Sequence, residues 1–304
     1  MDQRVEPRYV IVSPVKDEEK YIETTINAVI RQTVRPLRWI IVDDGSRDGT
    51  REIVKRYCGR FSWIATLEVS REGKTRGVSP VVRAFMCGLE VLSDSEFDFL
   101  VKLDGDLDLP PYYFERLMAR FQDDDRLGIA SGIYLEKDGS GWKQVWMPDY
   151  HAAGASKMLR AQCYRQIGGF ALHPGWDTVD EIRARAMGWK TCSFKGLAFH
   201  HLKPEGSATG YLRNDLKFGE IDYLTGVGPS FFFLKSLHRM IVGKPRFLAG
   251  LGLMAGFMKG FMMRRPKLVS AHEARLYRRL LNQRMVEEIR GIGKKLRGKV
   301  LAKT

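Results

Sequence analysis

The stretch FLVKLDGD (residues 99–106) runs through five mostly apolar residues and then sets two aspartates on either side of a glycine. Two other segments, YVIVS (9–13) and WIIVDD (39–44), are also short apolar runs that are followed abruptly by polar residues. Short apolar runs bounded by turn-forming residues are typical of buried strands. We therefore expect three buried strands, each with polar side chains at its carboxyl end.

The residues between these strands have helical periodicity. Apolar residues recur three and four positions apart within 22–30, 53–57 and 81–92. Strands that alternate with helices predict right-handed crossovers, and hence an α/β fold with a mostly parallel sheet and helices on both faces. Ligands of such open sheets bind beyond the carboxyl ends of the strands, and the three acidic clusters all fall there.

Asp104 and Asp106 lie one residue apart at the end of a predicted strand. A lone D-G-D is often a solvated turn, and Asp108 fits that view because Pro110 and Pro111 begin a helix whose N-terminal dipole favours a nearby carboxylate. Two adjacent carboxylates repel each other unless a cation neutralises them. The pair Asp104 and Asp106 therefore indicates a hard divalent ion, held by one or two carboxylates and completed by phosphate oxygens.

The segments VDDGS (42–46) and SPVKDEE (13–19) have two interpretations. Both can be simple strand exits, since Asp, Gly, Ser and Pro are turn formers. Alternatively, a carboxylate at this edge accepts hydrogen bonds from a nucleobase or ribose. In that case Asp43 or Asp44 is the acceptor, Pro14 shapes the neighbouring exit, and Glu18 is the polar candidate within it.

The segment GWDTVDEIRARAMGW (175–189) predicts a helix over 178–187 that opens after Asp177. With Asp180 at the third helical position, Asp177 would be the N-cap of a carboxylate variant of the capping box. Capping does not exclude catalysis, because an N-cap holds its carboxylate rigidly at the mouth of a helix. The neighbouring Trp176 either packs in the core or offers a ring on which a sugar stacks. The two histidines of FHHLKP (199–204) are more often a surface turn than a ligand set.

The C-terminal part of the chain differs in composition. Residues 264–304 hold 13 Lys/Arg and three Asp/Glu, a net of +10 out of +14 for the whole chain. The segment FLAGLGLMAGFMKGFMM (247–263) has no acidic residue and one lysine, and its length is at the lower limit of the roughly 17–25 residues that span a bilayer. It is either a core helix or an in-plane membrane helix whose basic flanks meet anionic headgroups.

Partners and compartment follow from the same composition. No zinc-finger, RNP or basic-zipper pattern accompanies the positive charge, so we expect no nucleic-acid partner and favour an anionic membrane surface. The four cysteines are scattered, without zinc or disulfide spacing, and no signal-peptide pattern is visible. We therefore expect a reducing compartment, with the protein cytoplasmic and peripheral on the cytoplasmic face of a membrane.

Taken in order, these motifs resemble family 2 of the glycosyltransferases, whose fold is GT-A. The resemblance rests on three blocks between roughly residues 8 and 204: SPVKDEE…VIRQT…WIIVDDGSRDGT, VVRAFMCGLE…FDFLVKLDGDLDLPPYYFERLMARF, and GWDTVDEIRARAMGW. It implies a Rossmann-like GT-A catalytic domain over 1–228, followed by a helical, apolar and basic extension over 229–304.

The resemblance also implies roles for individual residues. Asp104 and Asp106 would hold a manganese or magnesium ion on the diphosphate of a nucleotide-sugar donor, and Asp177 would be the general base. Asp43 or Asp44 and the region around Pro14 would contact the nucleotide, and His201 would be a further ligand to the metal or the diphosphate. The family's usual residues are replaced at three positions, by Trp176 before the base and by Lys16 and Asp17 after the proline.

The expected reaction follows from these residue types. A divalent metal neutralises the leaving diphosphate as a Lewis acid, and a carboxylate takes the proton of the acceptor hydroxyl. One base without a covalent nucleophile implies a single displacement with inversion. We expect a metal-dependent inverting glycosyltransferase that acts on a glycan or lipid-linked acceptor in cell-surface or exported polysaccharide or glycolipid assembly.

Two alternatives remain open. A polyprenyl-phosphate sugar synthase of the same fold would use an already ionised acceptor, and the candidate base at Asp177 argues against it. A non-catalytic membrane-binding protein on a degenerate glycosyltransferase fold would be expected to lose the aspartates, which are intact here.

Overall fold

The computed structural model describes residues 7–69, 78–92, 96–203, 210–243 and 245–301, with 289 and 291–301 described by their backbone alone. The chain divides into two compact units, Met1–Glu205 and Gly206–Thr304. The division falls earlier than the 228/229 boundary expected from the sequence, because helix α7 (Tyr211–Leu224) packs along α9 (Leu248–Met262) of the second unit.

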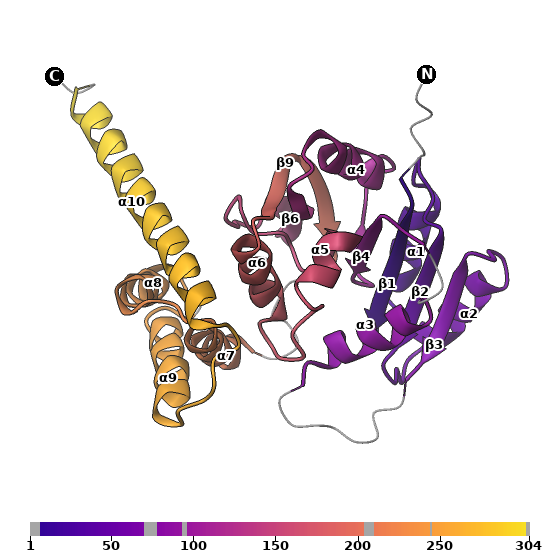
Figure 1. Ribbon diagram of the computed structural model, residues 1–304, viewed down its shortest axis with the longest axis horizontal. Coiled ribbons are helices and arrows are strands. Elements are labelled where there is room, and N and C mark those ends of the chain that lie inside the picture. The colour runs from indigo at the N-terminus through magenta and orange to yellow at the C-terminus, as the bar shows by residue number, and fades with distance from the viewer. Residues whose placement is uncertain (1–6, 70–77, 93–95, 204–209, 244, 302–304) are drawn as a thin grey trace. The chain divides into compact units, whose positions relative to one another are not determined.

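In the described part of the first unit, nine strands form one sheet in the order β3-β2-β1-β4-β8-β6-β9-β5, with β7 beside β6 (Figure 1). The strands are β1 (Tyr9–Val15), β2 (Arg38–Asp43), β3 (Ile64–Glu68), β4 (Phe99–Leu103), β5 (Leu107–Asp108), β6 (Leu127–Asp138), β7 (Gly141–Gln144), β8 (Ser156–Arg160) and β9 (Lys190–His201). The expected parallel pairing holds among β1, β2, β3 and β4. The sheet becomes mixed at β8, which runs antiparallel to β4 and β6.

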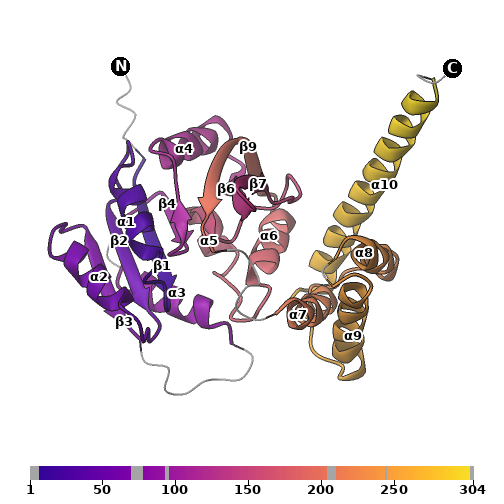
Figure 2. The same ribbon diagram turned by 180° about the vertical axis from the view of Figure 1, so that it is seen from behind.

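Helices cover both faces of this sheet, as expected (Figures 1 and 2). They are α1 (Ile22–Ile30), α2 (Thr50–Cys58), α3 (Pro80–Glu90), α4 (Tyr113–Asp123), α5 (Ala161–Gln166) and α6 (Trp176–Ala186). Successive residues of a strand point to opposite faces, so in β1 Ile11 packs with α1, α2 and α4, whereas Val12 packs with α3, α5 and α6.

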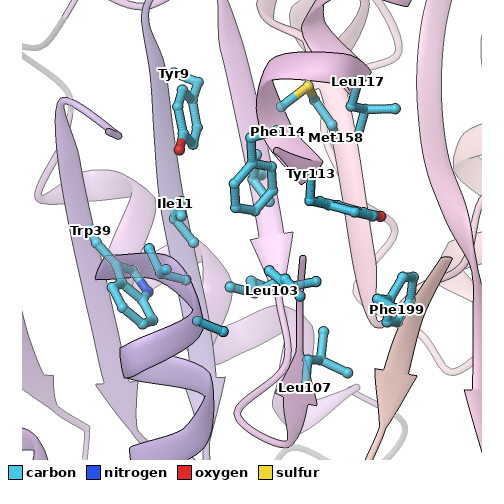
Figure 3. Packing of buried hydrophobic residues seen from close by; sticks show 14 of the residues in the cluster. Tyr9, Ile11, Trp39, Leu103, Leu107, Tyr113, Phe114, Leu117, Met158 and Phe199 are labelled. Atoms are coloured by element: carbon cyan, nitrogen blue, oxygen red, sulfur yellow. The ribbon is translucent and has the colours of Figure 1, made fainter. Parts of the chain in front are cut away.

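The core around Ile11 is dense with large side chains. Figure 3 shows Trp39 of β2 and Leu103 of β4 on the same side of the sheet as Ile11, with Phe114 of α4 above them. All four are fully buried, and burial of such a side chain contributes roughly 1.5–3 kcal/mol. This core fixes the carboxyl ends of the central strands, from which the candidate site projects.

The second unit consists of helices in its described part: α7, α8 (Pro229–Val242), α9 and α10 (Ala271–Leu301). The glycines of α9 face its neighbours. A Cβ atom at Gly256 would overlap the carbonyl oxygen of Leu216 in α7, and one at Gly250 would lie 2.5 Å from the carbonyl oxygen of Ser236 in α8. The glycine-rich composition therefore lets three helix backbones approach closely. Within the described ranges, no helix combines the length and apolar character needed to cross a membrane.

Candidate active site

The exits of β1 and β2 are bound to each other at the carboxyl edge of the sheet. The amide of Glu18 donates to Oγ1 of Thr50 at 2.8 Å, and Oδ1 of Asp17 accepts from the amide of Arg47 at 2.8 Å. Asp17 has a φ of +54°, a conformation that Asp adopts more readily than most residues. These bonds bring two predicted regions together, since Pro14 also pairs with Val42 in register.

Asp43 and Asp44 are both buried at this edge. The Asp43 carboxylate accepts from the amide of Ser46 at 2.8 Å and from Nε of Arg51 at 2.9 Å. Oδ1 of Asp44 lies 3.5 Å from Nη2 of Arg83 on α3. The predicted nucleotide-binding carboxylates thus lie at the expected place, and each has an arginine partner within the protein.

Glu18 reaches the D-G-D segment. A Cβ atom at Gly105 would lie 2.9 Å from Cγ1 of Val15 and 3.6 Å from Cγ of Glu18, so the β1 exit passes directly over this glycine. Oε1 of Glu18 accepts from Nζ of Lys203 at 2.8 Å, whereas Oε2 is buried and has no hydrogen-bond partner among the described residues. Burial raises the pKa of Glu18 to about 7; Lys203 opposes this rise, and Asp106 adds to it.

Asp104 is held by a buried lysine. Nζ of Lys102, whose residue is 3% exposed, donates to Oδ1 of Asp104 and to the carbonyl of Gly154, the latter at 2.8 Å. The amide of Asp104 donates to the carbonyl of Ala155 at 2.8 Å. Burial raises the pKa of the Asp104 carboxyl, Lys102 lowers it, and Asp106 raises it further.

Asp106 lies beside His201, another residue that the sequence suggested as a ligand. Leu107 of β5 pairs with His201 of β9, and Nε2 of His201 lies 3.5 Å from Oδ2 of Asp106. The other ring nitrogen, Nδ1, lies 2.9 Å from Oε1 of Glu136 on β6. Burial lowers the pKa of His201, but Asp106 and Glu136 outweigh it and raise the value to about 9.

We call Glu18, Asp104 and Asp106 the carboxylate cluster. In the described ranges, no group of three or more His, Cys, Asp or Glu side chains is arranged to hold a metal ion by itself. Magnesium is commonly bound by one or two carboxylates, with the remaining positions filled by water and substrate phosphates. The oxygen donors of the cluster suit such a hard cation, and the unpartnered Oε2 of Glu18 adds a further buried acceptor.

Asp177 differs in local structure from the sequence-based expectation. Helix α6 begins at Trp176, and its N-cap is Gly175 with a φ of +94°. Asp177 is therefore the second helical residue and not the N-cap, because a glycine at 175 can adopt the left-handed turn that starts the helix one residue earlier. The expected capping partner, Asp180, is fully buried and bonded to Lys157 instead.

The Asp177 carboxylate lies close to Gly154, which shares a lysine partner with Asp104 of the carboxylate cluster. A Cβ atom at Gly154 would lie 3.6 Å from Oδ2 of Asp177. The carbonyl of the same glycine accepts from Lys102, which also donates to Asp104. The candidate base Asp177 and the candidate metal ligand Asp104 therefore lie on either side of the hydrogen-bonded pair Gly154 and Lys102.

A network of buried charged groups, which the sequence did not predict, supports the start of α6. Nζ of Lys157 donates to the backbone carbonyl of Asp177 at 2.9 Å and to Oδ2 of Asp180 at 3.0 Å. Glu181 lies within 3.4 Å of the same ammonium and 3.0 Å from Nδ1 of His151. Burial raises the pKa of Asp180 to about 7 against the effect of Lys157. The pKa of Glu181 is lowered, because His151 and Lys157 outweigh burial.

Trp176 is part of this packing. Its ring lies 5.5 Å from Nζ of Lys102 and 5.2 Å from Nζ of Lys157, and these two lysines are directly opposite each other on β4 and β8. Its ring centroid is 4.6 Å from that of Phe170, and the residue is 9% exposed. The sequence left open whether Trp176 packs in the core or stacks on a sugar. In the structure its ring packs in the core and makes cation–π contacts.

Among the site residues that the sequence analysis did not identify, Lys102 carried a sequence signal. Lys102 interrupts an otherwise apolar predicted strand, and a charge in a buried strand indicates an internal partner. The partners of His201 and Glu18 carried no such signal, because Glu136 and Lys203 are 65 and 185 residues away in the chain.

Comparison with known proteins agrees with this fold. Residues 10–172, more than half of the chain, match the family described as Glycosyl transferase family 2. The fold is that of GT-A glycosyltransferases. The chain therefore belongs to glycosyl transferase family 2 and carries a glycosyltransferase domain.

Two curated relatives extend over about half of the chain. The succinoglycan biosynthesis protein ExoA of Rhizobium meliloti is 29% identical over 191 residues, which are 56% of this chain and 54% of ExoA. The cholesterol galactosyltransferase of Borreliella burgdorferi is 24% identical over 165 residues, 52% of this chain and 43% of the relative. The chain thus spans about half the length of these relatives.

Two solved structures share the fold over most of the chain. The mannosyltransferase PcManGT from Pyrobaculum calidifontis, in complex with GDP-Man and Mn2+, superposes with a TM-score of 0.55 at 16% identity, over 90% of this chain and 79% of that one. S. aureus TarS in complex with UDP gives a TM-score of 0.52 at 15% identity, over 89% and 78%. At these identities the likeness concerns the fold alone.

Proposed function

We propose that this protein transfers a sugar from a nucleotide-diphosphate sugar to a hydroxyl of a glycan or lipid-linked acceptor, with inversion. The observation that carries the proposal is that Asp177 lies close to Gly154, whose carbonyl accepts from the same Lys102 that binds Asp104. This arrangement keeps a half-buried carboxylate close to a second acidic site without merging the two. A base for the acceptor and a binding site for the donor diphosphate need such separate but adjacent places.

In this proposal Asp104 and Asp106 hold a divalent manganese or magnesium ion. His201 is a further ligand, either to the diphosphate as the imidazolium that its raised pKa favours, or to the metal after metal binding has displaced its proton. The bound ion would supply Lewis-acid neutralisation of charge on the leaving diphosphate. In addition to burial, Asp106 raises the pKa of both Glu18 and Asp104, and a bound cation would relieve this repulsion between neighbouring carboxylates. The neighbour solved with GDP-Man and Mn2+ is consistent with this assignment.

The chain's own cations balance the carboxylate cluster. Lys102 binds Asp104, Lys203 binds Glu18, and His201 lies against Asp106. Each acid of the cluster therefore has one basic partner, which stabilises the site before a donor binds. Pro14, Asp43 and Asp44 lie at the adjacent β1 and β2 exits, where we place the nucleotide.

Asp177 is the proposed general base. It accepts the proton of the acceptor hydroxyl as the oxygen attacks the anomeric carbon, a contribution of typically 10²–10⁴-fold. The bond from Lys157 to the backbone carbonyl of Asp177 fixes the first turn of α6, so Lys157 acts as a positioning residue. A single base without a covalent nucleophile accounts for inversion.

The biological role proposed here is cell-surface or exported polysaccharide or glycolipid assembly. It is supported by the relatives named for succinoglycan biosynthesis and for cholesterol galactosylation. The nucleotide sugar and the acceptor are substrates of this proposal, at a cytoplasmic location.

A panel of nucleotide sugars tests the function directly. A true donor should raise the melting temperature more with Mn2+ than without it, and should release its nucleoside diphosphate when acceptor is added. Asp106→Ala should abolish both the metal-dependent stabilisation and transfer, and exhaustive chelation should do the same to the wild-type protein.

The matched control is Asp108→Ala, which removes the third aspartate of the same stretch. Asp108 pairs with Arg31 and should be dispensable for metal binding. Full activity of Asp106→Ala, or of the chelated protein, would reject the metal assignment.

A further inference from the structure

Helix α9 has an apolar face that its neighbours leave uncovered. Most of the exposed residues of α9 are apolar, and Leu248, Leu251, Ala255, Met258 and Met262 recur at spacings of three and four. The exposed Lys259 pairs with Glu220 of α7. The opposite face carries Gly252, Gly256 and Gly260, which contact α7. A helix that is hydrophobic all round is normally buried on all sides or placed in a membrane, and only half of this one is covered by the unit.

Helix α8 uses its basic residues for pairing with α7 and leaves large apolar residues exposed. Lys235 and Arg239, whose side chains are 39% and 42% exposed, pair with Asp222 and Asp215 of α7, at 2.7 and 3.1 Å. The two acids are nearly buried, with residue exposures of 7% and 1%. The exposed large apolar residues of the same helix are Phe233, Leu234, Leu237, Ile241 and Val242.

The two apolar stripes flank one seam. Ser236 and Met240 of α8 contact Gly250 of α9, and the ring centroids of Phe232 and Phe257 are 4.1 Å apart across the same seam. Helical spacing places the exposed side chains of both helices on the outer side of this seam, away from α7. We call Phe233, Leu237, Ile241, Leu251, Met258 and Met262 the α8–α9 face. Exposed apolar patches shared between elements mark interaction sites.

The charge around this face is net positive, although four of its basic residues are paired with acids of α7: Lys235, Arg239, Lys259 and Arg265. The 50 residues from 223 to 272 contain eight Lys/Arg and no Asp or Glu. The basic residues that bound α9, Arg246 and Arg264, are exposed. The acids of α7 are already engaged, since Glu220 pairs with Lys259 and Arg265. The partner of the face must therefore be apolar where it meets the helices and anionic around them.

We propose that the α8–α9 face docks on an anionic lipid bilayer, with α8 and α9 lying in the plane of the membrane surface. Apolar side chains at the headgroup boundary combined with flanking lysines and arginines are the features that bind such surfaces. An in-plane orientation agrees with the finding that no described helix can cross a membrane. A second copy of the chain fits less well, because pairing two such faces would oppose basic residues with basic residues.

Vesicle flotation of the full-length protein tests the docking independently of any transferase activity. The protein should float with phosphatidylcholine vesicles that contain phosphatidylglycerol, float much less with phosphatidylcholine alone, and detach as salt is raised, because salt screens surface charges. Arg246→Gln/Arg264→Gln should reduce the preference for the anionic vesicles. Its control, Arg116→Gln/Arg126→Gln, removes two exposed arginines of the first unit and should not.

A second pair of variants tests the face itself. Ile241→Glu/Met262→Glu places charges at positions that are 71% and 75% exposed, so folding should be unaffected, as circular dichroism and thermal melting can verify. Partition onto anionic vesicles should fall at least ~10-fold, since this binding scales with buried apolar area. The control, Leu37→Glu/Val91→Glu, adds the same charge at exposed apolar positions of the first unit and should bind like the wild type.

Three results would overturn the proposal. The wild-type protein could fail to float with anionic vesicles at low salt. The Ile241→Glu/Met262→Glu variant could float as well as the wild type. Finally, light scattering could show a wild-type dimer that this variant dissociates while vesicle binding is unchanged, which would assign the face to a second copy.

Discussion

The two units of this protein differ in where they place charge and hydrocarbon: both bury carboxylates, but among the described residues only the N-terminal unit also buries lysines. The N-terminal unit buries ions: Lys102, Lys157 and Asp180 are 3%, 0% and 0% exposed. The C-terminal unit exposes large apolar side chains, with Ile241 and Met262 at 71% and 75%. Exposed apolar atoms are common on proteins, but buried charges and contiguous apolar patches are not. The buried lysines hold Asp104 and the first turn of α6 in place, whereas the exposed apolar patch has no partner of this kind and marks the candidate docking face of the second unit.

The two features have different energetic consequences. A buried ion pair loses several kcal/mol of hydration per ion, and removing one partner leaves the other uncompensated. An exposed apolar side chain merely forgoes the roughly 1.5–3 kcal/mol that burial would contribute. Substitutions should therefore be severe in the buried network and nearly silent on the exposed face, as long as stability is what is measured.

The largest expected effect is at Lys157. Lys157→Met leaves Asp180 and Glu181 buried beside an apolar side chain and should lower the free energy of unfolding by about 3–5 kcal/mol. Urea denaturation measures this change. The control, Lys55→Met, removes a lysine whose ion pair with Glu68 is exposed and should change the free energy by less than about 1 kcal/mol. A similar loss of unfolding free energy in both variants would contradict the distinction between buried and exposed ion pairs.

The next effect concerns activity and should spare stability. Asp177→Asn should cut turnover by at least the ~10²-fold expected of a lost general base. Because Asp177 lies in the first turn of α6, loss of its charge next to the helix dipole should change stability by only about 0.3–1 kcal/mol. Turnover of donor and acceptor at saturation measures the first, and thermal melting the second.

Asp149→Asn is a suitable control for Asp177→Asn, since Asp149 is an exposed partner of Lys195. Retained turnover in Asp177→Asn would contradict the assignment of the base. It would instead favour an acceptor that is already ionised, such as a lipid phosphate.

A smaller effect is expected in the second unit, at its closest helix contact. Gly256→Ala would drive a methyl group into the backbone of Leu216, so α7 and α9 must separate; overpacking of this kind costs typically 1–3 kcal/mol. Gly141→Ala is the control, because a Cβ atom there would meet nothing within 4 Å. Equal unfolding free energies for the two variants would show that the helices are not packed as described.

The smallest effect is expected on the exposed face. Ile241→Gln should leave the free energy of unfolding within about 0.5 kcal/mol of the wild type, as surface substitutions usually do, while it weakens vesicle binding. A loss near the ~1.5–3 kcal/mol of a buried side chain would mean that Ile241 is covered in the folded protein. That result would contradict the view that the second unit exposes large apolar side chains.

Much of the fold was predictable because its signals are local. The apolar runs 9–13, 39–44 and 99–104 became β1, β2 and β4, and the residues after them lie at one edge of the sheet. The antiparallel insertion of β8 was not predictable, since a short strand carries no mark of its direction. The unit boundary was also missed, because the packing of α7 on α9 depends on contacts between distant glycines and backbone atoms.

The candidate site was predictable to a similar extent. Pro14, Glu18, Asp43, Asp104 and Asp106 were chosen as polar residues at strand ends, and the structure places them there. Their catalytic and binding roles remain predictions.

The errors and omissions in the site have physical causes. The start of α6 was misplaced because a positive φ at Gly175 cannot be read from composition. The link between His201 and Glu136 depends on the register of β6 and β9, which no local pattern records.

The glycine contacts of α9 also constrain how this sequence can change over generations. Gly250 and Gly256 face backbone atoms of a neighbouring helix, so a larger residue at either position requires that α9 and its neighbour move apart. The other side of α9 is exposed at positions 248, 251, 255, 258 and 262. These positions can therefore change among apolar residues of different shapes. We therefore expect the glycine positions of α9 to change very slowly during evolution. The positions on its outer side should change quickly, as long as they remain apolar.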